Sequence, residues 1–512
     1  MTRLCHLLVW TFIVSCSCLS PATAQQPRPN IVFLFADDLG YGDIGAFGQT
    51  KIHTPNLDQL AKSGMRLTQC YAGNAVCAPS RCVLMTGMHP GHAQVRNNRE
   101  VKPEGQHPLT AGTATLPRLL KQLGYTTGGF GKWGLGGPDS DGRPTKQGID
   151  RWFGYNCQRV AHSHYPPYLW DNDEKFPLNN PPLTGHEKLP AGADPNDERS
   201  YAGLAGAEYG MDVITDQAVK FVHDNKDKPF FLYFPSIIPH FALQVPEDSL
   251  VEYKGKFPDA PYTGNYTANR TPRATYAAMV TRLDKHAGMI IKAVRDLGLE
   301  ENTIFIFTSD NGPVFDSLSG DRGDFFNSAS GLRGRKGTLW EGGIREPTIV
   351  SWKGHIAPGT TSDRVIGFED WLPTLLELAG GKAETPKDTD GISFAPTLLG
   401  QQQQPRPFLY REFAPGGGQQ MVRIGDWKGV RMGMQPGAGK GKAKAKAAEK
   451  ATAKANPASP PNLKIQLYNL KTDRAETTDV ADQHPDIVAQ IKKIMRDQHT
   501  PNPEFPLPGI DG

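Results

Sequence analysis

Apolar residues gather in short continuous runs along the chain, and polar residues close each run. Residues 30–35 form such a run, and Ala36, Asp37 and Asp38 follow it. Similar runs cover residues 229–234 and 303–308. A short run that is apolar throughout is typical of a strand that is buried on both faces of a sheet. Phe130 and residues 349–352 mark two further strands of this kind.

Between these runs, apolar residues recur at the three- to four-residue spacing of helices. Strands that alternate with helices predict an α/β fold with a largely parallel sheet. Asp37, Asp38 and Asp310 directly follow predicted strands, so we expect the functional site at the carboxyl ends of those strands. The predicted helices cover residues 56–63, 116–123, 212–225, 273–297 and 370–379.

The pattern changes after residue 400. Short strand-like segments and one closing helix predict a small antiparallel sheet with one helix packed on it. We therefore divide the mature chain into a catalytic domain, residues 25–400, and a C-terminal α+β subdomain, residues 401–512. Residues 436–461 are rich in Gly, Lys and Ala, which predicts a disordered surface loop. The strands are expected at 408–413, 420–424, 427–431 and 465–469, and the helix at 486–497.

Composition places the chain among soluble globular proteins. It has 512 residues, of which 38% are hydrophobic and 21% charged, and its net charge is +3. Residues 436–461 contain six lysines and one acidic residue, so the rest of the chain is slightly acidic. Such a chain lacks the basic field that nucleic-acid binding needs, and no nucleic-acid partner is expected.

The N-terminus has the organisation of a targeting segment. Arg3 precedes an apolar run, residues 4–19, and Ala22-Thr23-Ala24 is a small-residue cleavage site. This predicts a signal peptide over residues 1–24 and a secreted or periplasmic mature protein. The run is shorter than the roughly 20 residues of a spanning helix, so no integral membrane segment is expected after signal removal. An alternative is a lipobox ending at Cys16, which would anchor the protein to lipid.

Residues 77–87 read Cys-Ala-Pro-Ser-Arg-Cys-Val-Leu-Met-Thr-Gly. A thiol beside a cation, here Cys77 and Arg81, is an arrangement that activates a nucleophile, and a buried cysteine before a helix is the alternative. The spacing resembles the sulfatase signature C-x-P-S-R-x-x-L-x-T-G. In that family the cysteine is oxidised after translation to formylglycine (3-oxoalanine), whose hydrate attacks sulfur. The resemblance therefore implies that Cys77 needs a formylglycine-generating maturation enzyme.

Two further segments resemble later sulfatase signatures. Residues 124–136 resemble G-Y-x-T-x-x-x-G-K-W-H-x-G, and residues 334–343 match G-x-K-G-x-x-x-E-G-G. By this resemblance Lys132 and Lys336 would hold the sulfate oxygens. A solvated surface charge is the ordinary alternative for a single lysine.

His240 follows the apolar run that begins at residue 229. The matching histidine of the family touches the sulfate near the leaving oxygen. His240 is therefore a candidate general acid, with Lys336 as its competitor, and a strand-end histidine bonded to backbone is the alternative.

Asp37, Asp38, Asp310 and Asn311 form the candidate metal site. Carboxylate and amide oxygens are hard ligands, which suit Ca²⁺ or Mg²⁺ better than zinc. A helix cap or turn is the alternative for such a pair of carboxylates. The resemblance implies one Ca²⁺ ion, with the modified Cys77 as a further ligand.

Gly134 departs from the family pattern, which usually has a histidine there that helps to expel the sulfate from the modified residue. His162 and His164 are candidates for its replacement or for substrate binding, and a surface loop is the alternative. Gln158 and Arg159 lie in a segment that corresponds to a substrate-side loop of the family. The change also creates a G-x-G-x-x-G match, which we reject as a dinucleotide site because no helix is expected to follow.

The resemblance implies an alkaline-phosphatase-like α/β core with a large, mostly parallel sheet. It implies a sulfuric ester hydrolase that acts on a sulfated carbohydrate, of galactose or N-acetylgalactosamine type, or on an aryl sulfate. One alternative is a phosphatase or phosphodiesterase of the same superfamily, and another is a carbohydrate-binding pseudo-sulfatase.

Cysteine usage adds little to these expectations. With the signal removed and Cys77 converted, Cys70, Cys82 and Cys157 remain. An odd number predicts no disulfide framework, and a Cys70–Cys82 bridge stays open.

Overall fold

The computed structural model describes residues 28–314, 324–435 and 460–511. The predicted signal peptide with Cys16 and nearly all of the Lys-rich stretch 436–461 lie outside these described residues. Among the helices that are described, we find none with the length and apolar character that crossing a membrane requires.

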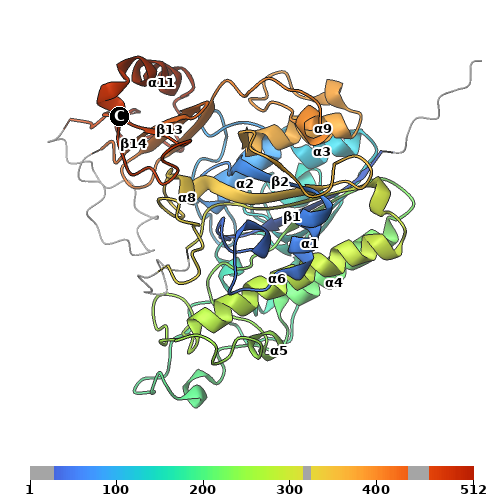
Figure 1. Ribbon diagram of the computed structural model, residues 1–512. Coiled ribbons are helices and arrows are strands. Elements are labelled where there is room, and N and C mark those ends of the chain that lie inside the picture. Colours follow the sequence, from blue (N-terminus) through green and yellow to red (C-terminus); the bar gives the residue numbers. More distant parts are fainter. Residues whose placement is uncertain (1–27, 315–323, 436–459, 512) are drawn as a thin grey trace, which may run out of the picture.

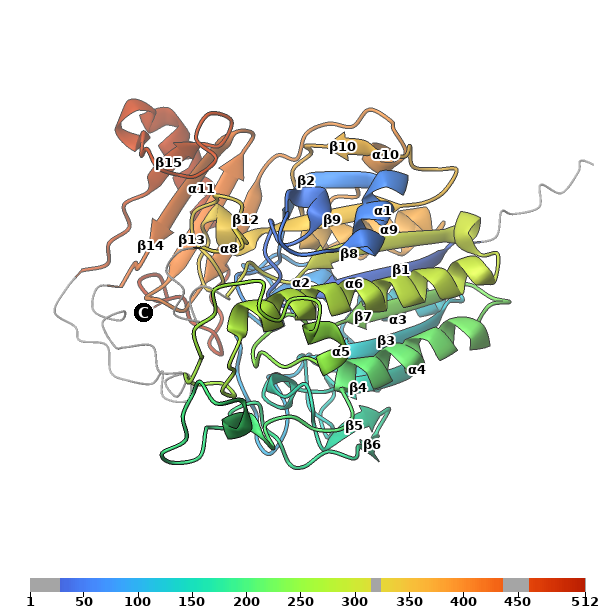
Figure 2. The same ribbon diagram turned by 60° about the horizontal axis from the view of Figure 1, so that its bottom comes forward.

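In the described residues, eleven strands form one mixed, mostly parallel sheet. Its order is β10-β2-β9-β8-β1-β7-β3-β4-β5-β6, with β11 also paired to β2, and Figure 2 shows this succession from top to bottom. The strands are β1 Asn30–Ala36, β2 Met65–Tyr71, β3 Thr126–Lys132, β4 Arg151–Tyr155, β5 Tyr168–Asp171, β6 Glu174–Pro177, β7 Phe230–Pro235, β8 Thr303–Ser309, β9 Arg345–Ser351, β10 Thr360–Ser362 and β11 Ile366–Gly367.

Helices cover both faces of this sheet (Figure 1). Every residue of β1 is buried, and alternate side chains enter two different cores, as the period of a strand requires. Leu34 packs with residues of α4 and α6, while Phe33 packs with residues of α2, α3 and α9. The helices are α1 Pro55–Ser63, α2 Cys77–Thr86, α3 Leu116–Gln122, α4 Gly210–Asp224, α5 Glu247–Leu250, α6 Pro272–Asp296, α8 Glu341–Ile344, α9 Trp371–Leu378, α10 Ala395–Leu398 and α11 Pro485–Asp497.

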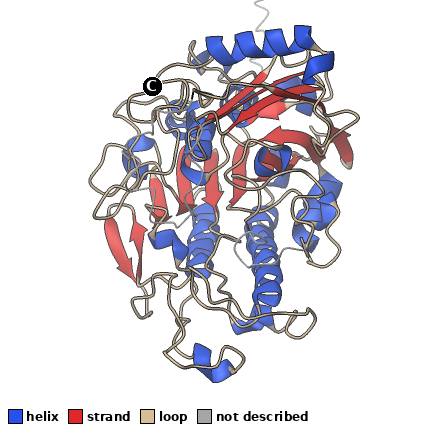
Figure 3. Cartoon of the chain, turned by 90° about the vertical axis from the view of Figure 1, so that its left-hand side faces the viewer, coloured by secondary structure: helices blue, strands red, loops and turns tan. Residues whose placement is uncertain are grey.

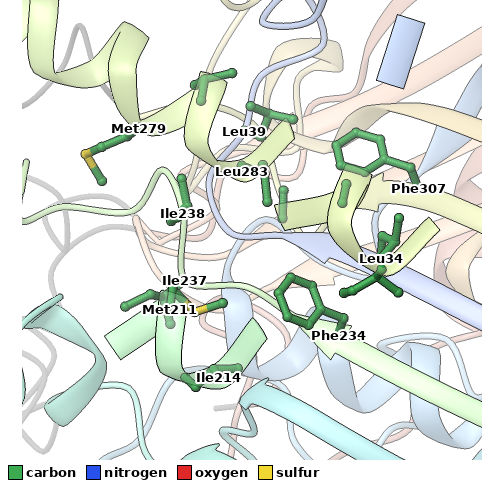
Figure 4. Packing of buried hydrophobic residues seen from close by; sticks show 14 of the residues in the cluster. Leu34, Leu39, Met211, Ile214, Phe234, Ile237, Ile238, Met279, Leu283 and Phe307 are labelled. Atoms are coloured by element: carbon green, nitrogen blue, oxygen red, sulfur yellow. The ribbon is translucent and has the colours of Figure 1, made fainter. Parts of the chain in front are cut away.

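The core beneath α4 and α6 shows why these strands read as continuous apolar runs. Leu34, Phe234 and Phe307 come from neighbouring strands and face the same core, which Met211 and Leu283 of the helices complete (Figure 4). Burying such side chains stabilises the fold by roughly 1.5–3 kcal/mol each, because their apolar surface leaves water.

The predicted α/β class is confirmed, and the five predicted helices correspond to α1, α3, α4, α6 and α9. Six strands of the large sheet were not predicted, namely β2, β4, β5, β6, β10 and β11. β2 contains Arg66, Thr68 and Gln69, which break its apolar run, and the polar positions are only half-buried. Helix α2 was anticipated only as the alternative interpretation of the Cys77 motif.

A second sheet of four antiparallel strands lies beside the first, as predicted, and Figure 3 shows the strands of both sheets in red. Its strands run in the order β12 Leu409–Phe413, β13 Gln419–Ile424, β14 Trp427–Met432 and β15 Gln466–Asn469. Ile491 and Met495 of α11 pack on it with Val422 and Leu467.

The small sheet holds the segment that carries Lys336. Gln419 accepts a hydrogen bond from the amide of Leu339 at 3.0 Å and donates one to the carbonyl of Gly337 at 3.0 Å. Lys428 places its ammonium 2.9 Å from carboxylate oxygens of both Glu341 and Glu476, with all three side chains out of solvent. The position of Lys336 therefore depends on the second sheet.

The described cysteines Cys70, Cys77, Cys82 and Cys157 are all free and buried. The open Cys70–Cys82 bridge is thus not formed, and packing rather than cross-linking stabilises the described part of the chain.

We expect Lys428→Met to destabilise the protein by about 3–5 kcal/mol, because it leaves the buried carboxylate of Glu476 without its cation and Glu341 with Arg345 alone. Urea denaturation followed by tryptophan fluorescence measures this loss. Lys471→Met, which changes an exposed lysine, is the matched control and should shift stability by less than about 0.5 kcal/mol. Equal free energies of unfolding for the two variants would show that the buried cluster of Lys428, Glu341 and Glu476 does not join the sheets.

Candidate active site

The ends of four neighbouring strands meet at one edge of the large sheet. Strands β8, β1, β7 and β3 are adjacent and parallel, so their carboxyl ends lie together. Asp310 follows β8, Asp37 follows β1, His240 lies a short loop beyond β7, and Lys132 ends β3. The Asp310 amide donates to the carbonyl of Ala36 at 3.1 Å, which fixes the two acidic turns beside one another.

Cys77 is the first residue of α2 and faces this edge. Its Sγ lies 3.3 Å from Oδ1 of Asp37 and 3.4 Å from Nζ of Lys336. Asn98 accepts a hydrogen bond from the amide of Ala78 at 2.9 Å and so satisfies one free donor of the helix start. A helix N-terminus usually lowers the pKa of a thiol. Here burial, followed by the charge of Asp37, raises the pKa of Cys77 instead.

Cys77 therefore remains a neutral thiol in this environment. The cation next to it in sequence, Arg81, turns away to bind carboxylates, so the interpretation of Cys77 as an activated thiolate is not supported.

Arg81 is completely buried and crosses the site. Its Nη2 lies 2.9 Å from Asp310 and 3.4 Å from Asp37, and its Nη1 donates to the carbonyl of Lys132 at 2.5 Å. Burial opposes the charge of Arg81, but Asp310 and the other negative groups around it together outweigh burial, and the pKa of Arg81 is raised. The guanidinium thus ties three strand ends together.

The two signature lysines reach the carboxylates from opposite sides. Nζ of Lys132 lies 2.6 Å from Oδ2 of Asp37, and Nζ of Lys336 lies 2.5 Å from Oδ1 of Asp38. Burial disfavours the ionised form of Asp37, but Lys132, His240 and Arg81 outweigh it and hold its pKa well below the usual range. Burial also opposes the charge of Lys336, but Asp38 and the acidic groups beside it together outweigh burial and raise the pKa of that lysine.

His240 lies against the same carboxylates. Its Nδ1 donates to the carbonyl of Phe241, and its Nε2 is 3.6 Å from Oδ2 of Asp38. Burial, and then the charge of Lys336, lowers the pKa of His240 well below its ordinary value. The ring is therefore neutral, with Nε2 as a free acceptor toward the site.

The acidic residues fit a hard divalent cation. Oδ2 of Asp38 and Oδ1 of Asn311 are buried, and neither has a hydrogen-bond partner in the part of the chain that the structure describes. Nδ2 of Asn311 donates to Oδ1 of Asp38 at 2.7 Å, which leaves the amide oxygen for another ligand. Unsatisfied buried oxygens beside further carboxylates are the donor set that Ca²⁺ or Mg²⁺ prefers.

Gln158 occupies the space beside Gly134. A Cβ atom built on Gly134 would stand 2.6 Å from Nε2 of Gln158. The Gln158 side chain is buried, and neither of its polar atoms has a partner among the described residues. The structure therefore puts this amide, rather than His162 or His164, next to the glycine that departs from the family pattern.

The other predicted substrate-side residues take different positions. His162 is half-buried and stacks on His240, with ring centroids 5.3 Å apart and planes 11° apart. His164 lies behind His240, where its Nε2 donates to the carbonyl of His240 at 3.0 Å and its Nδ1 is 3.0 Å from the hydroxyl of Tyr209. Burial lowers the pKa of His164 to about 4. Arg159 is exposed and pairs with Glu100 at 3.2 Å.

Two residues beside the site were not found from the sequence. His186 lies 2.9 Å from His162, and Tyr266 packs edge-on against the ring of His162. Both occupy irregular segments in which no periodicity or sulfatase signature marks a residue, so neither could be singled out from the sequence.

Comparisons with known proteins show which family the chain resembles. A family model described as Sulfatase matches residues 29–381. Human arylsulfatase A is 35% identical over 77% of this chain and 72% of its own length. An N-acetylgalactosamine-6-O-sulfatase of Bacteroides thetaiotaomicron is 29% identical over 93% of this chain and 94% of its own length. The crystal structure of Ps i-CgsB superposes with a TM-score of 0.71 over 92% of each chain, at 24% identity.

We expect the affinity for Ca²⁺ to fall as pH decreases from about 8 to 6. Burial, and then the charge of Asp37, raises the pKa of Asp310 to about 7, so protons compete with a cation for this carboxylate over that range. Isothermal titration calorimetry of chelator-treated protein measures the affinity. Asp310→Asn should bind less tightly and lose most of the pH dependence, whereas exposed Asp486→Asn should behave as wild type. An affinity that is constant with pH would contradict the assignment.

Proposed function

The chain belongs to the sulfatase family, whose members are sulfuric ester hydrolases, and we propose that it hydrolyses sulfate esters of a galactose or N-acetylgalactosamine type. The observation that carries this proposal is the position of Cys77. The signature cysteine begins a buried helix beside two lysine–aspartate pairs and the unsatisfied oxygens of Asp38 and Asn311. The names of the relatives support a carbohydrate substrate.

The proposed nucleophile derives from Cys77 through a maturation enzyme. Formylglycine at this position would supply a hydrated aldehyde as the oxygen nucleophile toward sulfur. Asn98 and the packing of α2 hold the position of residue 77 once it is modified.

Asp37, Asp38, Asp310 and Asn311 are the residues that would hold one Ca²⁺ ion. A bound cation would polarise the sulfate and favour the deprotonated hydrate. Arg81 keeps Asp310 and Asp37 oriented toward the site, since it contacts both carboxylates from the buried side.

Lys132 and Lys336 are placed to bind the sulfate oxygens. Both ammonium groups lie within 2.6 Å of carboxylates that a cation would share, so an incoming anion would find two donors near residue 77. Preorganised donors of this kind stabilise charge on the transferring group in a site that excludes water.

The leaving alcohol requires a proton, and two residues can deliver one. Lys336 carries a proton in the structure, because its pKa is raised, whereas His240 is neutral. The negative charge of a bound sulfate ester would favour protonation of His240 at Nε2. His240 then stands as the general acid, with Lys336 as its competitor.

We propose that the residues beside these groups recognise the substrate. The unpartnered amide of Gln158 and the half-buried ring of His162 flank the sulfate position and would meet the sugar. Arg159 would contribute at the exposed rim, and His164 would act by holding His240. We also propose that the protein acts outside the cytoplasm, on the basis of its N-terminal segment.

We expect Cys77→Ala to abolish hydrolysis of sulfate esters while the melting temperature stays within a few degrees of wild type. The matched control is Cys82→Ala, which removes a buried thiol of the same helix and should keep the activity. A panel of monosaccharides sulfated at single positions identifies the substrate, with phosphate esters as comparison. Turnover by Cys77→Ala, or a preference for phosphate esters, would contradict the proposal.

The loss of activity on replacing His240 should depend on the leaving group of the substrate. We expect His240→Asn to lower kcat/KM for a sugar sulfate by about 10²–10⁴-fold, because a sugar alcohol needs a proton to leave. The loss for a nitrophenyl sulfate should be much smaller, since nitrophenolate leaves without one. If Lys336→Met shows this leaving-group dependence and His240→Asn does not, Lys336 is the acid.

A further inference from the structure

His186 connects the site to the backbone of a neighbouring loop. Its Nδ1 is 3.0 Å from the carbonyl oxygen of Asn265, and its Nε2 is 2.9 Å from Nδ1 of His162. The rings of His186 and Tyr266 stack with centroids 5.1 Å apart. His162 in turn stacks on His240, so the chain of contacts leads from the Asn265 backbone to the general acid.

These contacts determine where the protons are. A backbone carbonyl can only accept, so Nδ1 of His186 carries a hydrogen. In a neutral His186 the other nitrogen, Nε2, is then an acceptor, and the 2.9 Å contact requires that His162 donates from Nδ1. A neutral His162 has one ring hydrogen, which leaves its Nε2 as an acceptor.

The surroundings favour a neutral His162. Burial, followed by His240, Lys132, His186 and Lys336, lowers the pKa of His162 well below its ordinary value. Nε2 of His162 has no hydrogen-bond partner among the described residues, and the ring is half-buried rather than enclosed. This atom is therefore available to a ligand.

Both histidines are held firmly enough to keep this arrangement. The carbonyl of His162 accepts from the amide of Ala242 at 3.1 Å. The segment around His186 is bonded to the loop that provides Asn265, since Thr267 donates its amide to Gly185 at 2.9 Å and Ala268 to Glu187 at 3.0 Å. Burial raises the pKa of Tyr266 to about 12 although the charge of Lys336 opposes the shift, so the phenol that packs on both rings is uncharged.

We propose that His186 is a positioning residue that fixes the tautomer of His162, with Nδ1 protonated and Nε2 presented to the substrate as a hydrogen-bond acceptor. This inference rests on the proposed function, in which His162 meets the sugar. It selects a substrate with a hydroxyl group near the sulfate ester, because a hydroxyl donates to an imidazole acceptor whereas a second acceptor group is repelled.

The tautomer can be measured directly on the matured, metal-loaded enzyme. Long-range ¹H–¹⁵N correlation spectra of protein labelled at histidine distinguish protonated from unprotonated ring nitrogens, and loss of signals in His162→Gln assigns the ring. We expect Nδ1 of His162 to be protonated and Nε2 to be unprotonated at neutral pH. A hydrogen on Nε2 of His162 would overturn the inference, and this readout does not depend on any activity.

Kinetics of two variants test the consequence. His186→Gln keeps an acceptor for His162 and a donor for Asn265, and should retain kcat/KM on the sulfated monosaccharide within about threefold. His186→Phe keeps a ring against Tyr266 but removes the acceptor, and should raise KM by about tenfold or more with little change in kcat. Hydrolysis of an aryl sulfate without a neighbouring hydroxyl should be unchanged in both variants. His223→Phe, an exposed histidine of α4, is the control.

The outcomes separate this inference from the proposed function. Equal kinetics of His186→Phe and wild type, or an equal loss on both substrates, would overturn the positioning role. Identical behaviour of His186→Gln and His186→Phe would also overturn it. If the wild-type enzyme cleaves no sulfate ester, the proposed function fails instead, and the spectra still decide the tautomer.

Discussion

The structure depends on how charge is balanced at the carboxyl edge of the large sheet. Asp37, Asp38 and Asp310 are buried there beside Arg81, Lys132 and Lys336. Burying any one of these groups alone would cost several kcal/mol, so each requires its partner and each partner must be held in place. Parallel strands provide the acidic turns and Lys132, helix α2 provides Arg81, and the second sheet holds the segment of Lys336.

This requirement gives the small sheet a role beyond covering apolar surface. Residues 334–343 have little regular structure of their own, apart from the short helix α8. Gln419 and Lys428 hold this segment through hydrogen bonds and buried ion pairs. The second sheet therefore takes part in the site without contributing a residue that faces residue 77.

The same charges explain the protonation states that the proposed chemistry uses. Burial and Asp37 keep Cys77 a thiol, and burial with Lys336 keeps His240 neutral. Under the proposed function, an incoming sulfate would change this balance, because it would add negative charge beside His240 and favour its protonation. His186 and His162 extend the control of protons to the substrate side of the pocket.

The sequence by itself determined the central strands, the flanking helices and the main reactive residues. Strands such as β1 are buried on both faces, so hydrophobicity alone marks them, and Cys77, Lys132 and Lys336 lie in signatures with fixed spacing. Strand β2 was not predicted from the sequence, because its polar side chains lie on a half-exposed face. Only the tertiary structure placed Gln158 beside Gly134, His164 behind His240 and His186 against His162. These are contacts between loops distant in sequence, and their partners are chosen by packing and hydrogen bonding rather than by any local pattern.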